Sequence, residues 1–254
     1  MSAQYPAPIS IDASVGCYTS DKYSGRALEP LGLANVKNSL NRIDIGDLVR
    51  KQAAVVIGIN GTEQILFFEN FVSIKELQQQ IAPGFNLASN LWLFNYLTES
   101  IDKHLLQSFE QVDFSNLSHN LSLNLNIQTV MGRHFQNFDN IVGKNTGKLI
   151  VELQQIDVFS NMSEFKKVRN QLRERGYTVL VDGLNPTSLR LFDLGNIDAD
   201  YYKFRSHSEI SEIQSIEAHS EIAKQIEYMG PSRFIITQAD TEATVRWGLQ
   251  LGIR

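Results

Sequence analysis

Residues 176–205 read GYTVLVDGLNPTSLRLFDLGNIDADYYKFR, and this stretch decides the fold. It predicts an apolar β-strand over Tyr177–Val181 that ends at an acid, Asp182. A loop and a short helix follow, and then a second strand over Asp200–Phe204 with Lys203 near its end. A continuous apolar strand with a charge at its end is typical of a parallel barrel, because both faces of such a strand are covered. In such barrels the functional side chains gather at the carboxyl ends of the strands.

The bulk composition limits the class of protein. A chain of 254 residues is long enough for one barrel-sized domain or two small ones. The net charge of −5 argues against a protein that binds DNA or RNA through a basic surface. The single cysteine, Cys17, excludes an internal disulfide and a cysteine zinc cluster. Without a signal peptide or an apolar run of about 18 residues, we expect a cytoplasmic protein with no membrane segment.

Strands and helices alternate along most of the chain. We expect a flexible lead-in over residues 1–35, which is rich in Pro, Gly and Ser, and one domain over residues 36–254. Asn60-Gly61 predicts a hairpin between strands at 53–59 and 64–68. Further strands are predicted at 121–125, 148–153 and 233–237, and helices at 36–51, 74–81, 87–109, 128–138, 163–175, 208–229 and 241–251. This alternation predicts βα units that form a parallel sheet.

The predicted strands number about seven, whereas a closed TIM-type barrel has about eight. The chain ends after a helix, at the point where another strand is due. We therefore expect an α/β barrel of the TIM-barrel type whose last strand is missing. Such a barrel has an unpaired edge, which proteins normally cover. We expect the N-terminal segment, a second copy of the chain or a protein partner to cover it.

Polar side chains fall at or near the ends of successive predicted strands. Three carboxylates and an amide oxygen are hard ligands that suit Mg²⁺ or Mn²⁺, and a nearby lysine can orient a water or a phosphate. A polar residue at a strand end is about as often a simple turn former. The candidates are Glu69, Asn124, Glu152 and Asp182 for a metal, Lys203 for a catalytic role and Gln238 for ligand binding.

The order of these residues over residues 50–254 resembles the EAL family, the cyclic di-GMP phosphodiesterases of bacteria. Glu69 in LFFENF is similar to the glutamate of the Glu-Ala-Leu signature, and Asn124 in LSLNLN to the asparagine of the Ser-Val-Asn-Leu-Ser segment. Glu152 in LIVELQQ resembles the first glutamate of the Glu-x-Thr-Glu segment. Asp182 resembles the first aspartate of the Asp-Asp-Phe-Gly loop, and Lys203 the lysine of the Asp-Tyr-x-Lys-x-Asp strand. The resemblance implies a barrel fold, a rim that holds metal and a cyclic di-GMP ligand.

The chain departs from the family pattern at several of the same motifs. The second aspartate, which helps hold a second metal in the family, is Gly183, and the following Phe-Gly-Thr-Gly loop is Leu184-Asn185-Pro186-Thr187. The arginine that holds a ligand phosphate is Ser73. The glutamate of the Ala-Glu-Gly-Val-Glu segment is Gln238, the aspartate after the lysine is Arg205, and the last barrel strand is missing.

These departures favour a domain that turns over cyclic di-GMP poorly. Two-metal hydrolysis needs two ions about 3.5–4 Å apart, and the carboxylate that would bridge them is absent. The first hypothesis is therefore a catalytically impaired regulatory or protein-interaction module, with or without cyclic di-GMP as its ligand and with one Mg²⁺ or Mn²⁺ or none. The second is an active metal-dependent phosphodiesterase with a rearranged second-metal site. The third is an unrelated βα protein whose strand ends match by chance.

Overall fold

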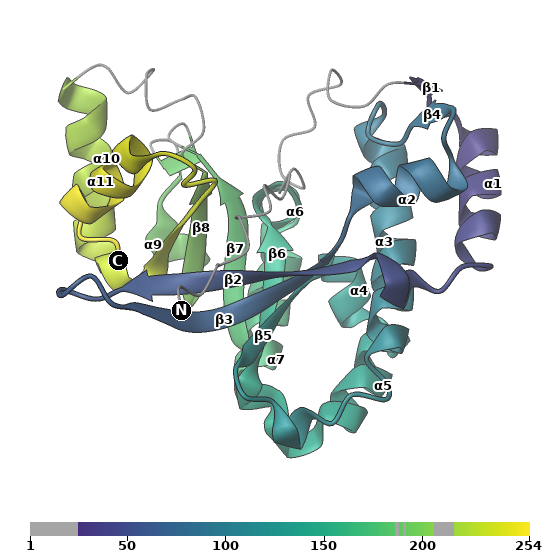
Figure 1. Cartoon of the computed structure of the whole chain (residues 1–254), viewed down its shortest axis with the longest axis horizontal. Coiled ribbons are helices and arrows are strands. Elements are labelled where there is room, and N and C mark those ends of the chain that lie inside the picture. The colour runs from purple at the N-terminus through teal and green to yellow at the C-terminus, as the bar shows by residue number, and fades with distance from the viewer. Residues whose placement is uncertain (1–24, 186–187, 190–191, 206–215) are drawn as a thin grey trace, which may run out of the picture.

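The computed structural model describes residues 25–185, 188–189, 192–205 and 216–254 of the chain (Figure 1). Most of the expected lead-in over residues 1–35 lies outside the described residues. So do Pro186 and Thr187 of the loop after the strand at 178–184, and the start of the helix predicted from Ser208.

A seven-stranded sheet forms the centre of the fold and confirms the predicted βα barrel type. Its strands follow one another in the order β2-β3-β5-β6-β7-β8-β9, with β2 antiparallel to β3 and every later pair parallel. Among the described residues no pairing joins β9 to β2, so the barrel is nearly closed but keeps two edge strands. The strands are β2 (Val49–Ile57), β3 (Glu63–Val72), β5 (Asn120–Asn124), β6 (Leu149–Gln154), β7 (Thr178–Leu184), β8 (Tyr201–Arg205) and β9 (Phe234–Thr237).

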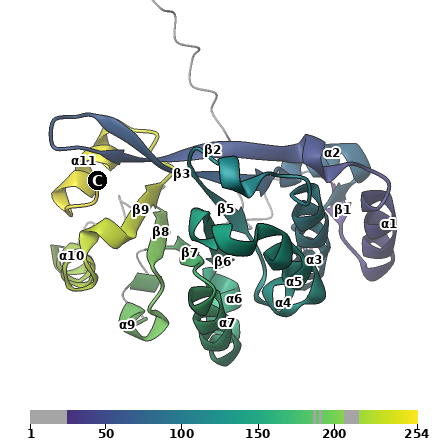
Figure 2. The same ribbon diagram turned by 90° about the horizontal axis from the view of Figure 1, so that it is seen from below.

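The β2–β3 hairpin spans the width of the molecule, and the C-terminus lies near its tip in both views (Figures 1 and 2). β3 pairs with β5 only over Phe67–Asn70, so the part of the hairpin nearer its tip projects beyond that pairing. There Val55 and Ile65 face each other across the two strands and are 44% and 41% exposed. The hairpin therefore carries an apolar, solvent-facing segment.

Helices line the outside of the curved sheet (Figure 2). Their inward faces are apolar: in α7, for example, Phe165, Val168 and Leu172 are buried at helical spacing. The helices are α1 (Pro30–Leu40), α2 (Ile74–Ile81), α3 (Leu91–Ser108), α4 (Ile127–Met131), α5 (Arg133–Val142), α6 (Gln155–Ser160), α7 (Met162–Glu174), α9 (Leu194–Ile197), α10 (Ile216–Met229) and α11 (Glu242–Gln250). Short 3-10 turns lie at Ile45–Leu48, Phe114–Asn116, Gly143–Lys148 and Pro231–Arg233.

The region before the sheet is more ordered than the sequence indicates. Residues Arg26–Ala27 form a short strand, β1, that pairs with β4 (Phe85–Asn86), and helix α1 begins at Pro30 rather than at Val36. Proline is favoured at the first position of a helix, because its missing N–H would have no partner there. The predicted helix over residues 36–51 is thus wrong in its bounds, since β2 already begins at Val49.

Two further helix predictions need correction. The helix predicted over residues 128–138 is two helices, α4 and α5, separated at Gly132, whose extended backbone (φ −89°, ψ 166°) interrupts the helical path. The helix predicted at 163–175 begins one residue earlier, at Met162, and Asn161 precedes it. It ends one residue earlier, at Glu174, and Gly176 just past its end has a φ of +90°.

A second, smaller apolar cluster fills the inside of the sheet. Phe67, Ile150 and Leu180 are buried together there, and Tyr201 and Ile235 pack against them. Side chains in a strand point to the same face at every second residue. The residues two positions further along β3, β6, β7 and β8 therefore project into the same interior, closer to the carboxyl ends of the strands.

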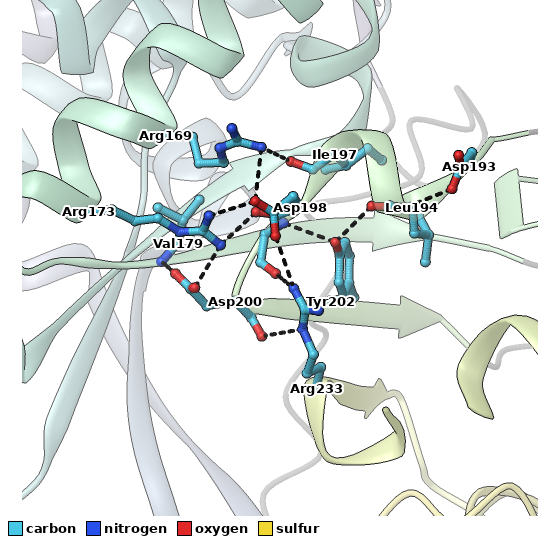
Figure 3. Close-up of polar contacts among 12 residues, drawn as sticks. Arg169, Arg173, Val179, Asp193, Leu194, Ile197, Asp198, Asp200, Tyr202 and Arg233 are labelled. Carbon is cyan, nitrogen blue, oxygen red and sulfur yellow. Dashed lines mark hydrogen bonds and ion pairs between the residues drawn. The ribbon is translucent and has the colours of Figure 1, made fainter. Parts of the chain in front are cut away.

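At the opposite, amino ends of β7 and β8, a network of ion pairs connects the strands to the helices outside them (Figure 3). Arg173 of α7 donates to Asp198 Oδ2 and Asp200 Oδ1, each at 2.8 Å. Asp200 also accepts from the backbone N–H of Val179 at 2.8 Å. The hydrogen bond from Arg173 holds the pKa of Asp198 below its ordinary value. This network is structural, because it lies at the end of the sheet away from the rim described below.

Candidate functional site

Strand register brings the predicted polar residues to one rim. Glu69 pairs with Ser122, Asn124 with Glu152, and Gln154 with Asp182, on four successive strands. Because β3 and β5 to β9 run in the same direction, their carboxyl ends meet at one edge of the barrel. This register predicts that the side chains of the rim lie in contact.

Lys203 lies at the centre of this rim. Its Nζ is 2.6 Å from Glu69 Oε2 and 2.6 Å from Glu152 Oε2, and the lysine is only 3% exposed. Glu152 is fully buried, and its Oε1 accepts a hydrogen bond from the hydroxyl of Ser122. A buried carboxylate is expected to have such partners, because an unpaired buried charge is costly.

The amide side chains extend the network towards β7. Asn124 Nδ2 donates to Glu69 Oε1 at 2.9 Å, and Gln154 Nε2 donates to Asp182 Oδ2 at 2.9 Å. Gln154 also lies 3.4 Å from Asn124 Oδ1. The structure therefore brings Glu69, Asn124, Glu152, Asp182 and Lys203 together in one connected cluster.

Burial and neighbouring charges shift the protonation of this cluster. Burial, with a contribution from the nearby Glu69 carboxylate, raises the pKa of Glu152 above its ordinary value. Burial alone would lower the pKa of Lys203, but the carboxylates of Glu152 and Glu69 outweigh it and raise the pKa above its ordinary value. Lys203 is thus the permanent cation of the rim.

The acids of the rim are engaged by donors of the chain itself. Both oxygens of Glu69, Glu152 and Asp182 already accept a hydrogen bond from the chain, the last from Gly183 N–H and Gln154. Over the described part of the chain, no three His, Cys, Asp or Glu side chains group closely enough to hold a metal ion. The ammonium of Lys203 supplies the positive charge at the point where two of the carboxylates converge.

The positions where the chain departs from the resembled family have local structural roles. Gly183 has a φ of +85°, a conformation that side-chain-bearing residues rarely adopt, and the β7–β8 register shifts beside it. Ser73 caps helix α2 by accepting a hydrogen bond from Glu76 N–H at 3.4 Å. Gln238 follows the end of β9 at the same rim, with a φ of +57°.

A hollow adjoins the rim, and Asn124 and Gln154 belong to both. Asp102 of α3 forms part of its wall and is buried, with its Oδ2 accepting from Asn126 N–H, Asn126 Nδ2 and Thr129 Oγ1 at 2.7–2.8 Å. Burial raises the pKa of Asp102 to about 6. Apolar side chains and both amides of the rim complete the lining, among them Phe71, Ile101, Leu105, Ile156, Asn124 and Gln154.

Sequence reasoning missed three members of this region. Ser122 and Gln154 lie two residues from Asn124 and Glu152 on the same strands, so the period-two alternation could have found them. Asp102 carried a weaker signal, because it is an acid between the buried Ile101 and Leu105 on an otherwise apolar helix face.

Comparison with known proteins identifies the fold. No protein-family model and no curated protein sequence matches the chain. Among solved structures, the EAL domain of Xanthomonas citri FimX in complex with cyclic di-GMP superposes with a TM-score of 0.61 at 10% identity, over 87% of this chain and 89% of that one. Vibrio cholerae LapD bound to cyclic di-GMP gives 0.64 at 13% identity, over 88% and 56%.

The manganese and cyclic di-GMP complex of Klebsiella pneumoniae BlrP1 gives a TM-score of 0.57 at 17% identity, over 82% of this chain and 54% of that one. The chain thus spans about half the length of the LapD and BlrP1 structures. At these low identities the similarity establishes the fold.

Proposed function

We propose that this chain, which has the fold of an EAL domain, is a catalytically impaired regulatory module that binds cyclic di-GMP in bacterial signalling in the cytoplasm. The observation that carries the proposal is the closed state of the rim: every carboxylate oxygen of Glu69, Glu152 and Asp182 is occupied by a donor of the chain. A water that attacks a phosphodiester would have to compete with these donors for a carboxylate oxygen.

Two substitutions support impaired turnover. At Gly183 the backbone has a left-handed conformation, so an acid placed there would strain the chain besides restoring a ligand. Ser73 is a helix cap and brings no positive charge to a phosphate. Loss of one charge-stabilising group commonly costs a factor of about 10² or more in turnover.

The hollow beside the rim supports recognition of a guanine base. The three hydrogen bonds on Asp102 all reach Oδ2, and the described residues offer no donor to Oδ1. A buried carboxylate is acceptor-only, which suits the two N–H groups on the Watson–Crick edge of guanine. The apolar walls formed by Phe71, Ile101 and Leu105 suit the faces of the ring.

We also propose that the module works through protein contacts at its open sheet edge, by pairing with a protein partner or a second copy. Over the described residues, β2 and β9 each pair with another strand on one side only. Such edges present unpaired N–H and C=O groups that a further strand can bind.

Calorimetric titration with cyclic di-GMP, with and without Mg²⁺ or Mn²⁺, tests the ligand. We expect cyclic di-GMP to bind without being converted to the linear dinucleotide. Chromatography of the nucleotide after incubation with the protein measures the conversion. Asp102→Asn should weaken binding about tenfold, because a charged carboxylate with two acceptor oxygens is replaced by a neutral amide with one acceptor oxygen and one donor NH₂ group. Asp113→Asn, an exposed acid that caps a 3-10 turn, is the matched control.

The results separate the hypotheses. Linear product at high protein concentration would replace this proposal with the active phosphodiesterase. An absence of binding under all metal conditions would rule out a cyclic di-GMP receptor and leave the protein-contact role alone.

A further inference from the structure

Alternation along β8 places three side chains on the interior face of the barrel. Tyr201 packs against the inner apolar cluster, and Lys203, two residues further, reaches Glu69 and Glu152. Arg205 is two residues further again and is the last residue of the strand. By the period of two, its side chain shares the face of Tyr201 and Lys203, one step closer to the mouth of the barrel.

The surroundings of Arg205 are unlike those of the other cations of the barrel. Its backbone pairs with Thr237, the last residue of β9, and its side chain is partly buried. Lys203 has two carboxylates and Arg173 has two, whereas within the described ranges no acid or carbonyl oxygen accepts a hydrogen bond from Arg205. The rim thus has an ion-paired lysine at its lower level and, above it, a guanidinium with no ion pair among the described residues.

The chemistry of the two cations at the rim divides their roles. Lys203 is 3% exposed and is paired with two carboxylates, so it is poorly placed to reach a ligand. Arg205 stands nearer to solvent and carries a planar guanidinium, whose paired N–H groups match two oxygens of a phosphate. A partly desolvated arginine also binds an anion more strongly than a fully exposed one, since solvent screens it less.

We propose that Arg205 is the anion-binding residue of the rim and that it contacts a phosphate of the bound cyclic dinucleotide. The inference rests on the proposed function, because it names the group that would hold the phosphates while the hollow at Asp102 holds a base. The position of Arg205, where the resembled family has an aspartate, would then serve to bind the ligand.

Titration of the full chain with cyclic di-GMP and, separately, with guanosine tests the assignment. Arg205→Gln should weaken cyclic di-GMP binding about tenfold or more and leave guanosine binding unchanged, because guanosine has no phosphate. The cyclic di-GMP affinity of Arg205→Lys should lie between those of the parent and Arg205→Gln, since lysine keeps the charge but lacks the paired N–H groups of the guanidinium. Arg246→Gln, on the exposed face of α11 where Arg246 pairs with Glu242, is the control and should bind as the parent does.

Thermal unfolding of each variant checks that the fold is kept. Equal cyclic di-GMP affinity of the parent and Arg205→Gln would overturn the role of Arg205 while leaving the receptor proposal intact. A loss that is equal for cyclic di-GMP and guanosine would also overturn it, because that pattern reports a general disturbance of the site. A parent chain that binds neither nucleotide would overturn the receptor proposal and this inference together.

Discussion

At the scale of single residues, Lys203 holds the rim together. It is the counter-charge of Glu69 and Glu152 in a place from which water is largely excluded. Lys203→Met keeps much of the volume but leaves these acids without a cation. We expect the free energy of unfolding to fall by about 3–5 kcal/mol, measured by urea denaturation at neutral pH.

A second variant separates charge from packing. Lys203→Met combined with Glu152→Gln should recover part of the lost stability, because the buried acid is then neutral as well. Lys148→Met is a control, since Lys148 donates only to the carbonyls of Ser115 and Leu117 near the surface. A loss below about 1 kcal/mol for Lys203→Met would mean that the cluster contributes no more than a surface ion pair.

The members of the rim could be predicted from the sequence to the extent that strand ends could be recognised. Glu69, Asn124, Glu152, Asp182 and Lys203 were predictable because each ends or nearly ends an apolar run, and parallel strands align their ends. The pairing of Lys203 with two acids was not predictable, because it depends on the directions of side chains from three strands, β3, β6 and β8. Asp102 escaped because helical neighbours of the rim have no strand-end signal.

At the scale of elements, α7 ends at a glycine that its geometry requires. Gly176 has a φ of +90°, and an added Cβ would lie 3.0 Å from Thr146 Oγ1. Gly176→Ala should destabilise the protein by about 1 kcal/mol, measured by thermal or urea unfolding. Gly84→Ala is the matched control, since nothing lies within 4 Å of its added Cβ, and it should change stability by less than about 0.5 kcal/mol. Equal effects of the two substitutions would contradict the role of the left-handed stop.

Elements with local signals were predicted well. Helix α2 has the predicted bounds, Ile74–Ile81, and α11 begins within one residue of the predicted start at 241, with Thr241 as its cap. Helix α1 was misplaced because its start depends on Pro30 and on packing against α2 and α3 rather than on apolar spacing. The break at Gly132 follows from one extended residue inside an otherwise helical pattern.

At the scale of the whole molecule, the two edge strands predict association. Val55 on β2 is 44% exposed, so a charge there should be tolerated by the fold and should oppose pairing with a further strand. We expect sedimentation to show a concentration-dependent dimer or a complex with a partner, which Val55→Lys weakens. Tyr228→Lys, on the exposed face of α10, should leave the association unchanged.

Edge pairing would be contradicted if the parent chain stays monomeric at all concentrations and the amides of β2 and β9 exchange freely in the presence of cell extract.

The barrel class itself was predictable because βα alternation is visible in the sequence. Whether the barrel closes was not predictable, because closure depends on how the β2–β3 hairpin and the C-terminal helix lie relative to the last strand.

No helix in the described ranges is both long and apolar enough to cross a membrane.

The ion-pair network at the amino ends of β7 and β8 has a consequence for how such a domain can change over generations. Because Arg173, Asp198 and Asp200 secure the strands at the end remote from the mouth, the mouth can exchange acids for neutral or basic groups without exposing the core. Cellular proteases remove chains that unfold, not chains that merely lose turnover. On this plan, side chains at the mouth that are not part of the buried Lys203 ion pairs can be replaced one at a time while the chain stays folded.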